Sequence, residues 1–382
     1  KNCYEVFDAA MHSRAVARLG GDEFTILLDD MREAEDAVQV ADRILESLSQ
    51  PFVLEGQEVF ATVSIGIAPG ANYEKPDDLV RDADTAMYRA KERGKNCYEV
   101  FDAAMHSRAV ARLQLETDLR KAIERNEFRV YYQPIVSLLD DSLVGFEALV
   151  RWQHPQRGLV PPGDFLPLAE ETGLILPIDL WVLRAAAQQT RDWQQRYASA
   201  RQLRVNVNLS TKQFSQVGLV ERVKDVLQAT GLDGQYLTLE ITESAIMEES
   251  KALAEMLDQI RKLDVRLYLD DFGTGYSSLG YLHRFPIHSL KIHSSFVWQL
   301  GKADDQSQLV RTITTLAENM NMGVVAEGVE TPEQLSKLRD LRCDRVQGYY
   351  FSKPLSAPDA EFLISNGPTW NGSSKFAKHP AN

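Results

Sequence analysis

The stretch Leu267-Tyr268-Leu269-Asp270-Asp271-Phe272-Gly273-Thr274-Gly275 decides the fold, because it shows how the apolar runs of this chain end. A pattern typical of a buried strand leads directly into two adjacent aspartates and a glycine-rich turn. Adjacent carboxylates repel each other, so holding them together at a water-poor strand end is costly unless a cation or a proton neutralises them. The pattern is more typical of a metal site than of a structural turn.

The same arrangement recurs along the last two-thirds of the chain, where short apolar strands alternate with amphipathic helices. Polar residues fall late in these strands: Gln133, Glu147, Asn208, Glu240, Asp270 with Asp271, Lys291, Glu327 and Gln347. Alternating β and α units with near-continuous apolar strands indicate a parallel sheet covered by helices, and eight strands in about 250 residues indicate a TIM-like (β/α)8 barrel. Active sites of such barrels lie at the C-terminal ends of the strands, so these residues are expected to converge on one mouth.

The residue types at these strand ends predict the chemistry of the mouth. Taken singly, Glu240 or Glu327 is more simply a surface acid or a cap, but their shared register favours a common site. Oxygen ligands without Cys or His fit Mg²⁺ or Mn²⁺ better than zinc. Two cations about 3.5–4 Å apart, bridged by one carboxylate, are used for in-line attack on a phosphoester.

The motifs around these positions resemble those of the EAL family of cyclic di-GMP phosphodiesterases, from about residue 113 to residue 363. The matching strings are Tyr132-Gln133-Pro134, Glu147-Ala148-Leu149-Val150-Arg151-Trp152, Val207-Asn208-Leu209-Ser210, Glu240-Ile241-Thr242-Glu243-Ser244, Asp270 to Leu279, Leu290-Lys291-Ile292, Ala326-Glu327-Gly328-Val329-Glu330 and Gln347-Gly348-Tyr349. The resemblance implies a cytoplasmic bacterial signalling enzyme that opens cyclic di-GMP to linear 5′-pGpG with two divalent cations, Mg²⁺ or Mn²⁺. A catalytically weakened EAL domain that only binds cyclic di-GMP as a sensor module is the alternative.

The resemblance also implies roles for individual residues. One cation would be held by Glu147, Asn208, Glu240 and Asp270, and the other by Asp270, Asp271 and Glu327. Catalysis would rest on Lys291, Glu327 and Glu147, with Lys291 beside the metal-activated water. Substrate contacts would be Gln133, Leu149, Arg151, Glu330 and Gln347.

A mobile loop, residues 272–282, is implied after the paired aspartates. Glu243 would support it, and Gly273 and Gly275 would supply the positive-φ freedom that a lid requires.

His293 departs from the family pattern, which has an aspartate two positions after the lysine. An imidazole cannot replace that negative charge. Three outcomes are open: His293 is tolerated at a reduced rate, it ligates a metal such as Mn²⁺, or the domain binds its ligand without turnover. The hypothesis carried forward is a weakened but real phosphodiesterase.

Residues 1–19 recur verbatim as residues 95–113, which indicates a recent duplication or a junction artefact rather than a structural repeat. The first copy leads into Gly20-Gly21-Asp22-Glu23-Phe24, and with the pattern that follows it resembles the C-terminal half of a GGDEF (diguanylate cyclase) domain. The first half of that domain is not present, and Met11 and Arg14 stand where the family's RxxD motif would lie, so no cyclase activity is expected. The predicted division is a duplicated linker (1–19), a partial α/β GGDEF-like domain (20–102), a linker (103–114), the EAL phosphodiesterase domain (115–363) and a disordered tail (364–382).

Composition excludes several other classes of protein. The formal net charge of −13 argues against binding a nucleic-acid polymer through a basic face. Three cysteines without a CxxC pair favour a reduced, cytosolic compartment. No apolar run of about 18 residues is present, so no membrane contact is expected of this chain, although a membrane-anchored parent is left open, as is a homodimer through the EAL domain.

Overall fold

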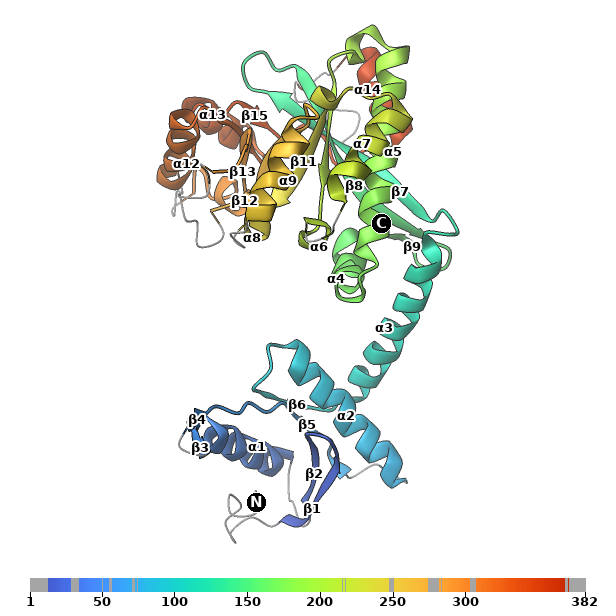
Figure 1. Cartoon of the computed structure of the whole chain (residues 1–382), viewed down its shortest axis with the longest axis vertical. Helices are drawn as coiled ribbons and strands as arrows, with labels where there is room; N and C mark the ends of the chain where they lie inside the picture. The colour runs from blue at the N-terminus through green and yellow to red at the C-terminus, as the bar shows by residue number, and fades with distance from the viewer. Residues whose placement is uncertain are drawn as a thin grey trace. The chain divides into compact units, whose positions relative to one another are not determined.

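The computed structural model describes residues 13–28, 34–49, 51–54, 57–70, 73, 75–214, 216, 218–246, 251–273, 282, 284–302, 307–367 and 370. The chain divides into two compact units, Lys1–Leu115 and Glu116–Asn382. Each unit is described by itself (Figure 1).

The first unit is a small α/β assembly. Its elements are β1 (Ser13–Gly20), β2 (Glu23–Leu28), α1 (Ala34–Leu48), β3 (Phe52–Leu54), β4 (Gln57–Val59), β5 (Ile65–Ile67), α2 (Pro76–Glu92), β6 (Tyr98–Val100) and the start of α3 (Ala103–Ala122). Helix α2 lies against β5, where a Cβ on Gly66 would come within 1.9 Å of the Ala83 carbonyl oxygen. Glycine at position 66 therefore permits the close approach of helix and strand.

Residues 13–19 and 107–113 have identical sequences but different structures. The first copy belongs to strand β1, which pairs with β2 so that Val16 faces Ile26 and Arg18 faces Phe24. The second copy belongs to helix α3, so the linker expected at 103–114 is helical. The structure of this segment is therefore determined by the residues around it and not by its own secondary-structure propensity.

The second unit contains a closed eight-stranded barrel, which confirms the predicted fold class. Its strands are β7 (Phe128–Ser137), β8 (Leu143–His154), β10 (Arg204–Asn208), β11 (Leu237–Thr242), β12 (Arg266–Phe272), β13 (Ser289–Ile292), β14 (Gly323–Ala326) and β15 (Arg345–Val346), with β9 (Gly158–Val160) attached to β8. The ladder runs from β10 through β15 to β7 and β8, and pairing of β8 with β10 closes it.

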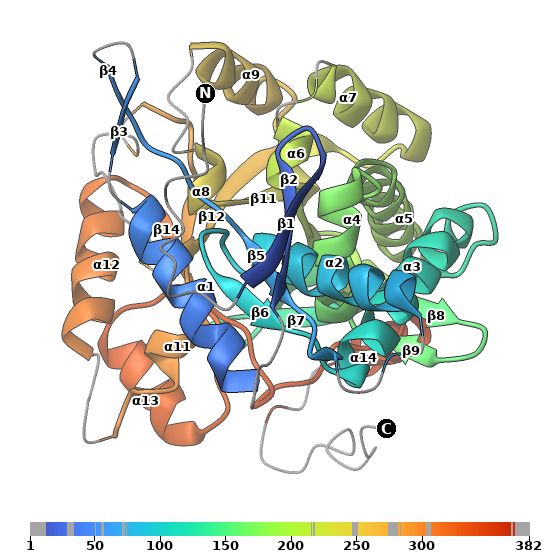
Figure 2. The ribbon, with the colours of Figure 1, turned by 90° about the horizontal axis from the view of Figure 1, so that it is seen from below.

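Helices cover the outside of the barrel, as Figure 2 shows for α5, α7, α9, α12 and α13. The helical elements are α4 (Pro162–Thr172), α5 (Ile175–Arg196), η3 (Ala198–Ala200), α6 (Thr211–Phe214), α7 (Leu219–Thr230), η4 (Gly234–Tyr236), α8 (Glu243–Ile246), α9 (Lys251–Arg261), α11 (Ser294–Val297), α12 (Ser307–Asn319), α13 (Pro332–Asp340) and α14 (Ala357–Asn366). Helix α5 buries Ile178, Val182 and Leu183, a helical stripe that packs against the barrel.

The alternation of strands and helices predicted a parallel sheet, but the sheet of the barrel is only partly parallel. Strand β7 runs antiparallel to both of its neighbours, β8 and β15. Only residues 138–142 join β7 to β8, and a connection this short cannot make the crossover that parallel strands require. The remaining barrel strands are parallel to one another, so their C-terminal ends still meet at one mouth.

The C-terminal residues differ in part from the predicted disordered tail. Helix α14 continues to Asn366, and the indole of Trp370 donates to the Asp141 carbonyl at 2.8 Å. Residues 368, 369 and 371–382 lie outside the described residues.

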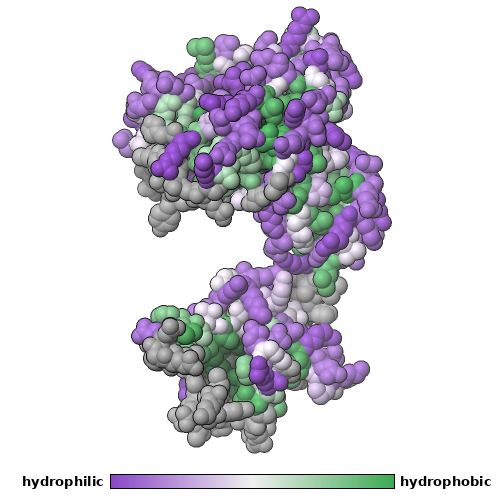
Figure 3. All heavy atoms as spheres, viewed as in Figure 1, coloured by the Kyte–Doolittle hydropathy of each residue, from purple (hydrophilic) through white to green (hydrophobic). Residues whose placement is uncertain are grey.

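Hydrophilic side chains predominate on the face of the barrel unit seen in Figure 3. Among the described residues no helix is long and apolar enough to cross a membrane.

Candidate active site

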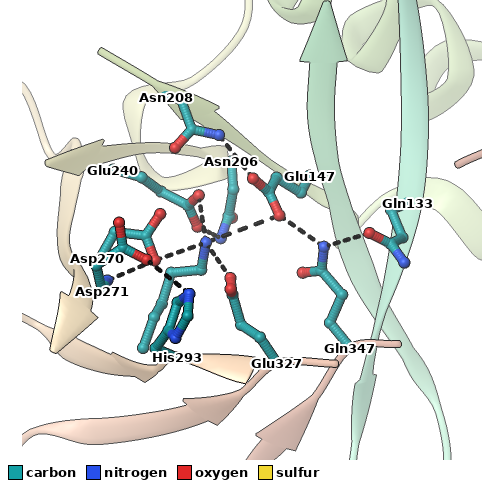
Figure 4. Close-up of polar contacts among 11 residues, drawn as sticks. Gln133, Glu147, Asn206, Asn208, Glu240, Asp270, Asp271, His293, Glu327 and Gln347 are labelled. Atoms are coloured by element: carbon teal, nitrogen blue, oxygen red, sulfur yellow. Dashed lines mark hydrogen bonds and ion pairs between the residues drawn. The ribbon is translucent and has the colours of Figure 1, made fainter. Parts of the chain in front are cut away.

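Strands of the barrel deliver the predicted polar residues to one place at their C-terminal ends (Figure 4). Alternate residues of a strand share a face, so Glu147 on β8, Asn208 on β10 and Glu240 on β11 point to the barrel interior together. Asp270 on β12, Lys291 on β13 and Glu327 just after β14 complete the group. The convergence expected from the sequence is therefore present in the structure.

The ammonium of Lys291 lies at the centre of this group. Its Nζ is 2.5 Å from Glu327 Oε1 and 2.7 Å from Glu240 Oε2. Asp270 Oδ1 is 3.2 Å away and Glu147 Oε2 is 3.7 Å away. The lysine is completely buried, so these four carboxylates are its immediate surroundings.

Amide side chains hold the carboxylates in place from outside the cluster. Asn208 Nδ2 donates to Glu147 Oε1 at 2.6 Å, and Gln347 Nε2 donates to Glu147 Oε2 at 2.6 Å. Gln347 Nε2 also donates to Gln133 Oε1 at 2.9 Å, and Gln133 Nε2 reaches the Ser352 carbonyl at 3.2 Å. Both oxygens of Glu147 are therefore oriented by neutral donors, which add no positive charge to that of Lys291.

Burial and mutual repulsion favour protonation of this cluster. Burial raises the pKa of Glu327 to about 8, against the opposing charge of Lys291. Burial likewise raises the pKa of Glu240 well above its usual value. Burial alone would lower the pKa of Lys291, but the charges of the surrounding carboxylates together raise it well above the usual value. The lysine is therefore charged, while the acids lack sufficient positive charge.

The donor set fits divalent cations. Four carboxylates around one ammonium leave negative charge in excess, and every ligating atom is a hard oxygen. In the part of the chain that the structure describes, no group of three or more Asp, Glu, His or Cys side chains has the arrangement of a ready-made cation site. The Lys291 ammonium lies at the centre of the carboxylates instead. The surplus charge and the raised pKa of Glu327 are what a site for added cations would show before they bind.

Asp271 lies at the edge of the cluster beside His293. Asp271 has a positive φ of 56°, and its backbone N–H donates to Asp270 Oδ1 at 2.9 Å. His293 Nε2 is 3.9 Å from Asp271 Oδ1. Burial and the charge of Asp270 raise the pKa of Asp271, and His293 opposes this rise.

His293 also caps the short helix α11. Its Nδ1 accepts from the Ser295 backbone N–H at 3.3 Å. In the neutral imidazole this assigns the proton to Nε2, the nitrogen nearer Asp271. In this arrangement the Nε2 proton lies on the side of Asp271 but beyond hydrogen-bond distance, and the Nδ1 lone pair is used by the Ser295 N–H.

The remaining residues implied by the resemblance lie around the mouth. Leu149 and Arg151 follow Glu147 on the same face of β8, and the Arg151 guanidinium lies 5.7 Å from the ring centre of Tyr131. Glu330 is exposed after β14.

Glu243 and Gly273 meet as the resemblance implied. Glu243 Oε2 accepts from the Gly273 N–H at 3.3 Å, and Gly273 has a φ of +94°. Gly275 lies outside the described residues, as does most of the expected loop.

Sequence reasoning missed two polar residues that support the site. Asn206 Nδ2 donates to Glu240 Oε1 at 2.7 Å, and its position two residues before Asn208 on the same strand face was the available signal. Asp179 on α5 accepts from the Ser210 N–H and hydroxyl, at 3.1 and 2.6 Å, and so holds the turn that follows Asn208. No local pattern could have identified Asp179, because its partner lies 31 residues away.

The GGDEF string has a different setting in the first unit. Gly21 and Asp22 form the turn of the β1–β2 hairpin, with a φ of +53° at Gly21. Asp22 and Glu23 are exposed, and Arg18 Nε donates to the Gly21 carbonyl at 2.9 Å.

Comparison with known proteins gives two family matches. The EAL domain matches residues 116–354, and the diguanylate cyclase GGDEF domain matches residues 6–97. The bifunctional diguanylate cyclase/cyclic di-GMP phosphodiesterase MucR of Pseudomonas aeruginosa is 42% identical over 344 residues, which are 90% of this chain and 50% of MucR. The cyclic di-GMP phosphodiesterase NbdA of the same organism is 38% identical over 353 residues, 92% of this chain and 45% of NbdA. The chain thus spans about half the length of the curated relatives it matches.

Solved structures agree with these matches. The phosphodiesterase domain of PaMucR in complex with c-di-GMP is 42% identical, with a TM-score of 0.62 over 65% of this chain and 99% of that one. The EAL enzyme Bd1971, with cAMP and cyclic di-GMP bound, is 31% identical, with a TM-score of 0.65 over 77% of each chain.

Proposed function

The chain belongs to the EAL-domain family, and from this premise we propose that its barrel hydrolyses cyclic di-GMP to linear 5′-pGpG with two divalent cations, Mg²⁺ or Mn²⁺. One observation carries the proposal: four strand-end carboxylates surround Lys291 within 3.7 Å and carry more negative charge than one ammonium balances. The bound cations would supply positive charge to the phosphodiester and an activated water.

We assign the cation ligands as the donor set and the family resemblance suggest. Glu147, Asn208, Glu240 and Asp270 would hold one cation, and Asp270, Asp271 and Glu327 the other. Asn206 and Asn208 donate to two of these carboxylates and so fix the directions of their free oxygens.

Lys291 has a distinct part in this proposal. Its buried ammonium lies within reach of the carboxylates that would ligate both cations, so it can position and polarise a water molecule held among them. Its raised pKa keeps it charged at neutral pH, which favours electrostatic positioning over proton abstraction.

The substrate would contact the outer residues of the mouth. Arg151 offers a guanidinium fork to a phosphate, and Gln133, Leu149, Glu330 and Gln347 would meet the rest of the dinucleotide. Cyclic di-GMP carries two negative charges, so the acidic mouth would repel it until cations reverse the local sign.

A sensor module is the second candidate, and one observation favours it. His293 stands beside Asp271 where the family resemblance places an aspartate, so this edge of the cluster lacks one negative charge. A domain of this kind would bind cyclic di-GMP without turnover.

Release of pGpG, followed by chromatography with and without Mg²⁺ or Mn²⁺, separates the two candidates. Hydrolysis that chelation abolishes and that Asp270→Asn removes supports the enzyme. Tight binding of cyclic di-GMP without any pGpG, with either cation, would establish the sensor module instead. Asp258→Asn, at a partly exposed acid on α9 whose partners are Arg261 and Lys262, is the matched control that should keep full activity.

We further propose the domain division given above, with the EAL domain extended to the end of α14 at Asn366. We also propose a cytoplasmic location for this part of the parent protein, and a homodimer through the EAL domain as the assembly to test. Diguanylate cyclase activity is not expected from the partial GGDEF match. Formation of cyclic di-GMP from GTP by the purified chain would refute that expectation.

A further inference from the structure

Three arginines begin strands at the end of the barrel opposite the mouth. Arg204 is the first residue of β10, Arg266 of β12 and Arg345 of β15; these three are called the arginine cluster below. Alternation along each strand places them on the inner face of the barrel, since Arg204 shares its face with Asn208, Arg266 with Asp270 and Arg345 with Gln347. The parallel strands therefore carry carboxylates at one end of the interior and guanidinium groups at the other.

The hydroxyl of Tyr268 links members of this cluster. Arg345 Nη1 donates to the Tyr268 hydroxyl at 2.5 Å, and Tyr268 is buried in the barrel interior with Ile135 and Val325. Burial lowers the pKa of Arg204, and the charges of Arg266 and Arg345 lower it further, while Tyr268 opposes the shift. The cluster is therefore half-buried, and its members are close enough to repel one another.

Within the described part of the chain, no ion pair within 4.0 Å joins the arginine cluster to an acid. Asp344, next to Arg345 in the chain, instead accepts from the Val324 N–H at 2.6 Å. A second unsatisfied group lies beside Arg266. Its ladder partner Thr238 is fully buried, and the Thr238 hydroxyl has no hydrogen-bond partner among the described residues. Three guanidinium groups and a buried, unpartnered hydroxyl are donors that a bound anion would satisfy, and its negative charge would relieve the repulsion among the arginines.

We propose that the arginine cluster is a binding site for a phosphate-type oxyanion, separate from the catalytic mouth. Guanidinium groups present paired N–H donors that match tetrahedral oxyanions, and three of them converge here from different strands. Because the Tyr268 hydroxyl already accepts from Arg345, its own proton is available to the anion. Inorganic phosphate and the phosphate of a monoester such as GMP share the required chemistry. The site does not depend on hydrolysis of cyclic di-GMP.

Phosphorus-31 NMR of inorganic phosphate, titrated into the full chain in EDTA at constant ionic strength, tests the proposal. EDTA removes divalent cations, so the acidic mouth cannot retain phosphate, and failure of the proposed hydrolysis would leave this result untouched. We expect saturable line broadening, and weakening by about tenfold or more in Arg204→Met, Arg266→Met and Arg345→Met. Arg157→Met, at an exposed arginine before β9, should bind as the unchanged chain does.

Tyr268→Phe keeps the proposal falsifiable if an arginine variant fails to fold. It removes only the hydroxyl and should weaken phosphate binding severalfold while the circular dichroism spectrum stays unchanged. A parallel titration with GMP identifies the source: tighter binding than phosphate assigns a nucleoside monophosphate, and equal binding assigns the free anion. The proposal is overturned if phosphate does not saturate, or if every variant binds it equally well, since the anion then lies elsewhere.

Discussion

Two of the chain's pairs of neighbouring acids, Asp22-Glu23 in the first unit and Asp270-Asp271 in the barrel, have opposite surroundings. Asp22 and Glu23 lie exposed at the turn of a two-stranded hairpin. Asp270 and Asp271 end a barrel strand, where Asp270 lies 3.2 Å from the buried ammonium of Lys291. Water screens the first pair, whereas the second requires compensating charge from the protein. An acidic pair becomes a candidate site through what the fold buries beside it.

Removal of the Lys291 ammonium should have the largest effect on stability, because the barrel cluster depends on a buried charge and the exposed hairpin does not. Lys291→Met removes the one ammonium that the described residues place among these carboxylates, so we expect the free energy of unfolding in EDTA to fall by about 3–5 kcal/mol. Urea denaturation measures it. Excess Mg²⁺ or Mn²⁺ should restore part of the loss, because a cation replaces the missing charge.

Lys262→Met is the matched control for this variant. Lys262 is an exposed lysine that pairs with Asp258 on the surface at 3.2 Å, and its loss should change the free energy of unfolding by less than about 0.5 kcal/mol. Equal effects of the two substitutions would show that the buried cluster does not depend on Lys291.

The pH dependence of cation binding gives the next largest effect. Glu327 has a pKa of about 8 in the folded chain against an ordinary value of 4.5, so the folded chain retains a proton that the unfolded chain has lost. The stability of the metal-free protein should therefore fall as pH rises from 4.5 to about 8. Mn²⁺ affinity at the site that includes Glu327 should move the opposite way and increase about fiftyfold between roughly pH 6 and 8, since the cation bound there displaces this proton.

Calorimetry in buffers of different ionisation enthalpy measures both the affinity and the protons released. Glu327→Gln should flatten the slope, because its amide has no proton to lose. A wild-type affinity that does not change across this range would contradict the assignment of Glu327 as a cation ligand.

Substitution of His293, at the edge of the cluster, should change the rate of hydrolysis by a smaller factor. His293→Asp restores a negative charge beside Asp271 and retains a good N-cap for α11, so we expect hydrolysis to increase by up to about tenfold without loss of fold. Steady-state release of pGpG measures it. His293→Asn, which keeps a cap but adds no charge, should stay near the wild-type rate. If the wild-type chain is wholly inert and only His293→Asp is active, the weakened phosphodiesterase gives way to the sensor module.

The sequence predicts the mouth far better than it predicts its supports. Strand-end positions and the two-residue alternation identify Glu147, Glu240 and Lys291, because parallel strands bring equivalent positions to one edge. Asp179 depends on a tertiary contact that no local pattern records. The antiparallel β7 was missed because polar alternation does not encode strand direction, which the short connection to β8 determines.

The duplicated segment shows the limit of local reasoning most directly. Val16 is in a strand and its copy Val110 is in a helix, although both lie in the same seven-residue sequence, residues 13–19 and 107–113. Pairing with β2 stabilises the first form, and continuation into residues 114–122 stabilises the second. Propensity alone cannot distinguish them.

Substitutions at the exposed β1–β2 hairpin should have the smallest effect on stability and activity. The double variant Asp22→Asn with Glu23→Gln keeps the size and the turn chemistry of both side chains and removes two solvated charges. Among the described residues neither acid forms an ion pair, so the free energy of unfolding should change by less than about 0.5 kcal/mol. Hydrolysis by the barrel should be unchanged. Asp270→Asn with Asp271→Asn, the same chemical change in the barrel, should instead abolish cation binding measured by calorimetry. Similar results for the two double variants would mean that burial beside Lys291 gives the second pair no special role.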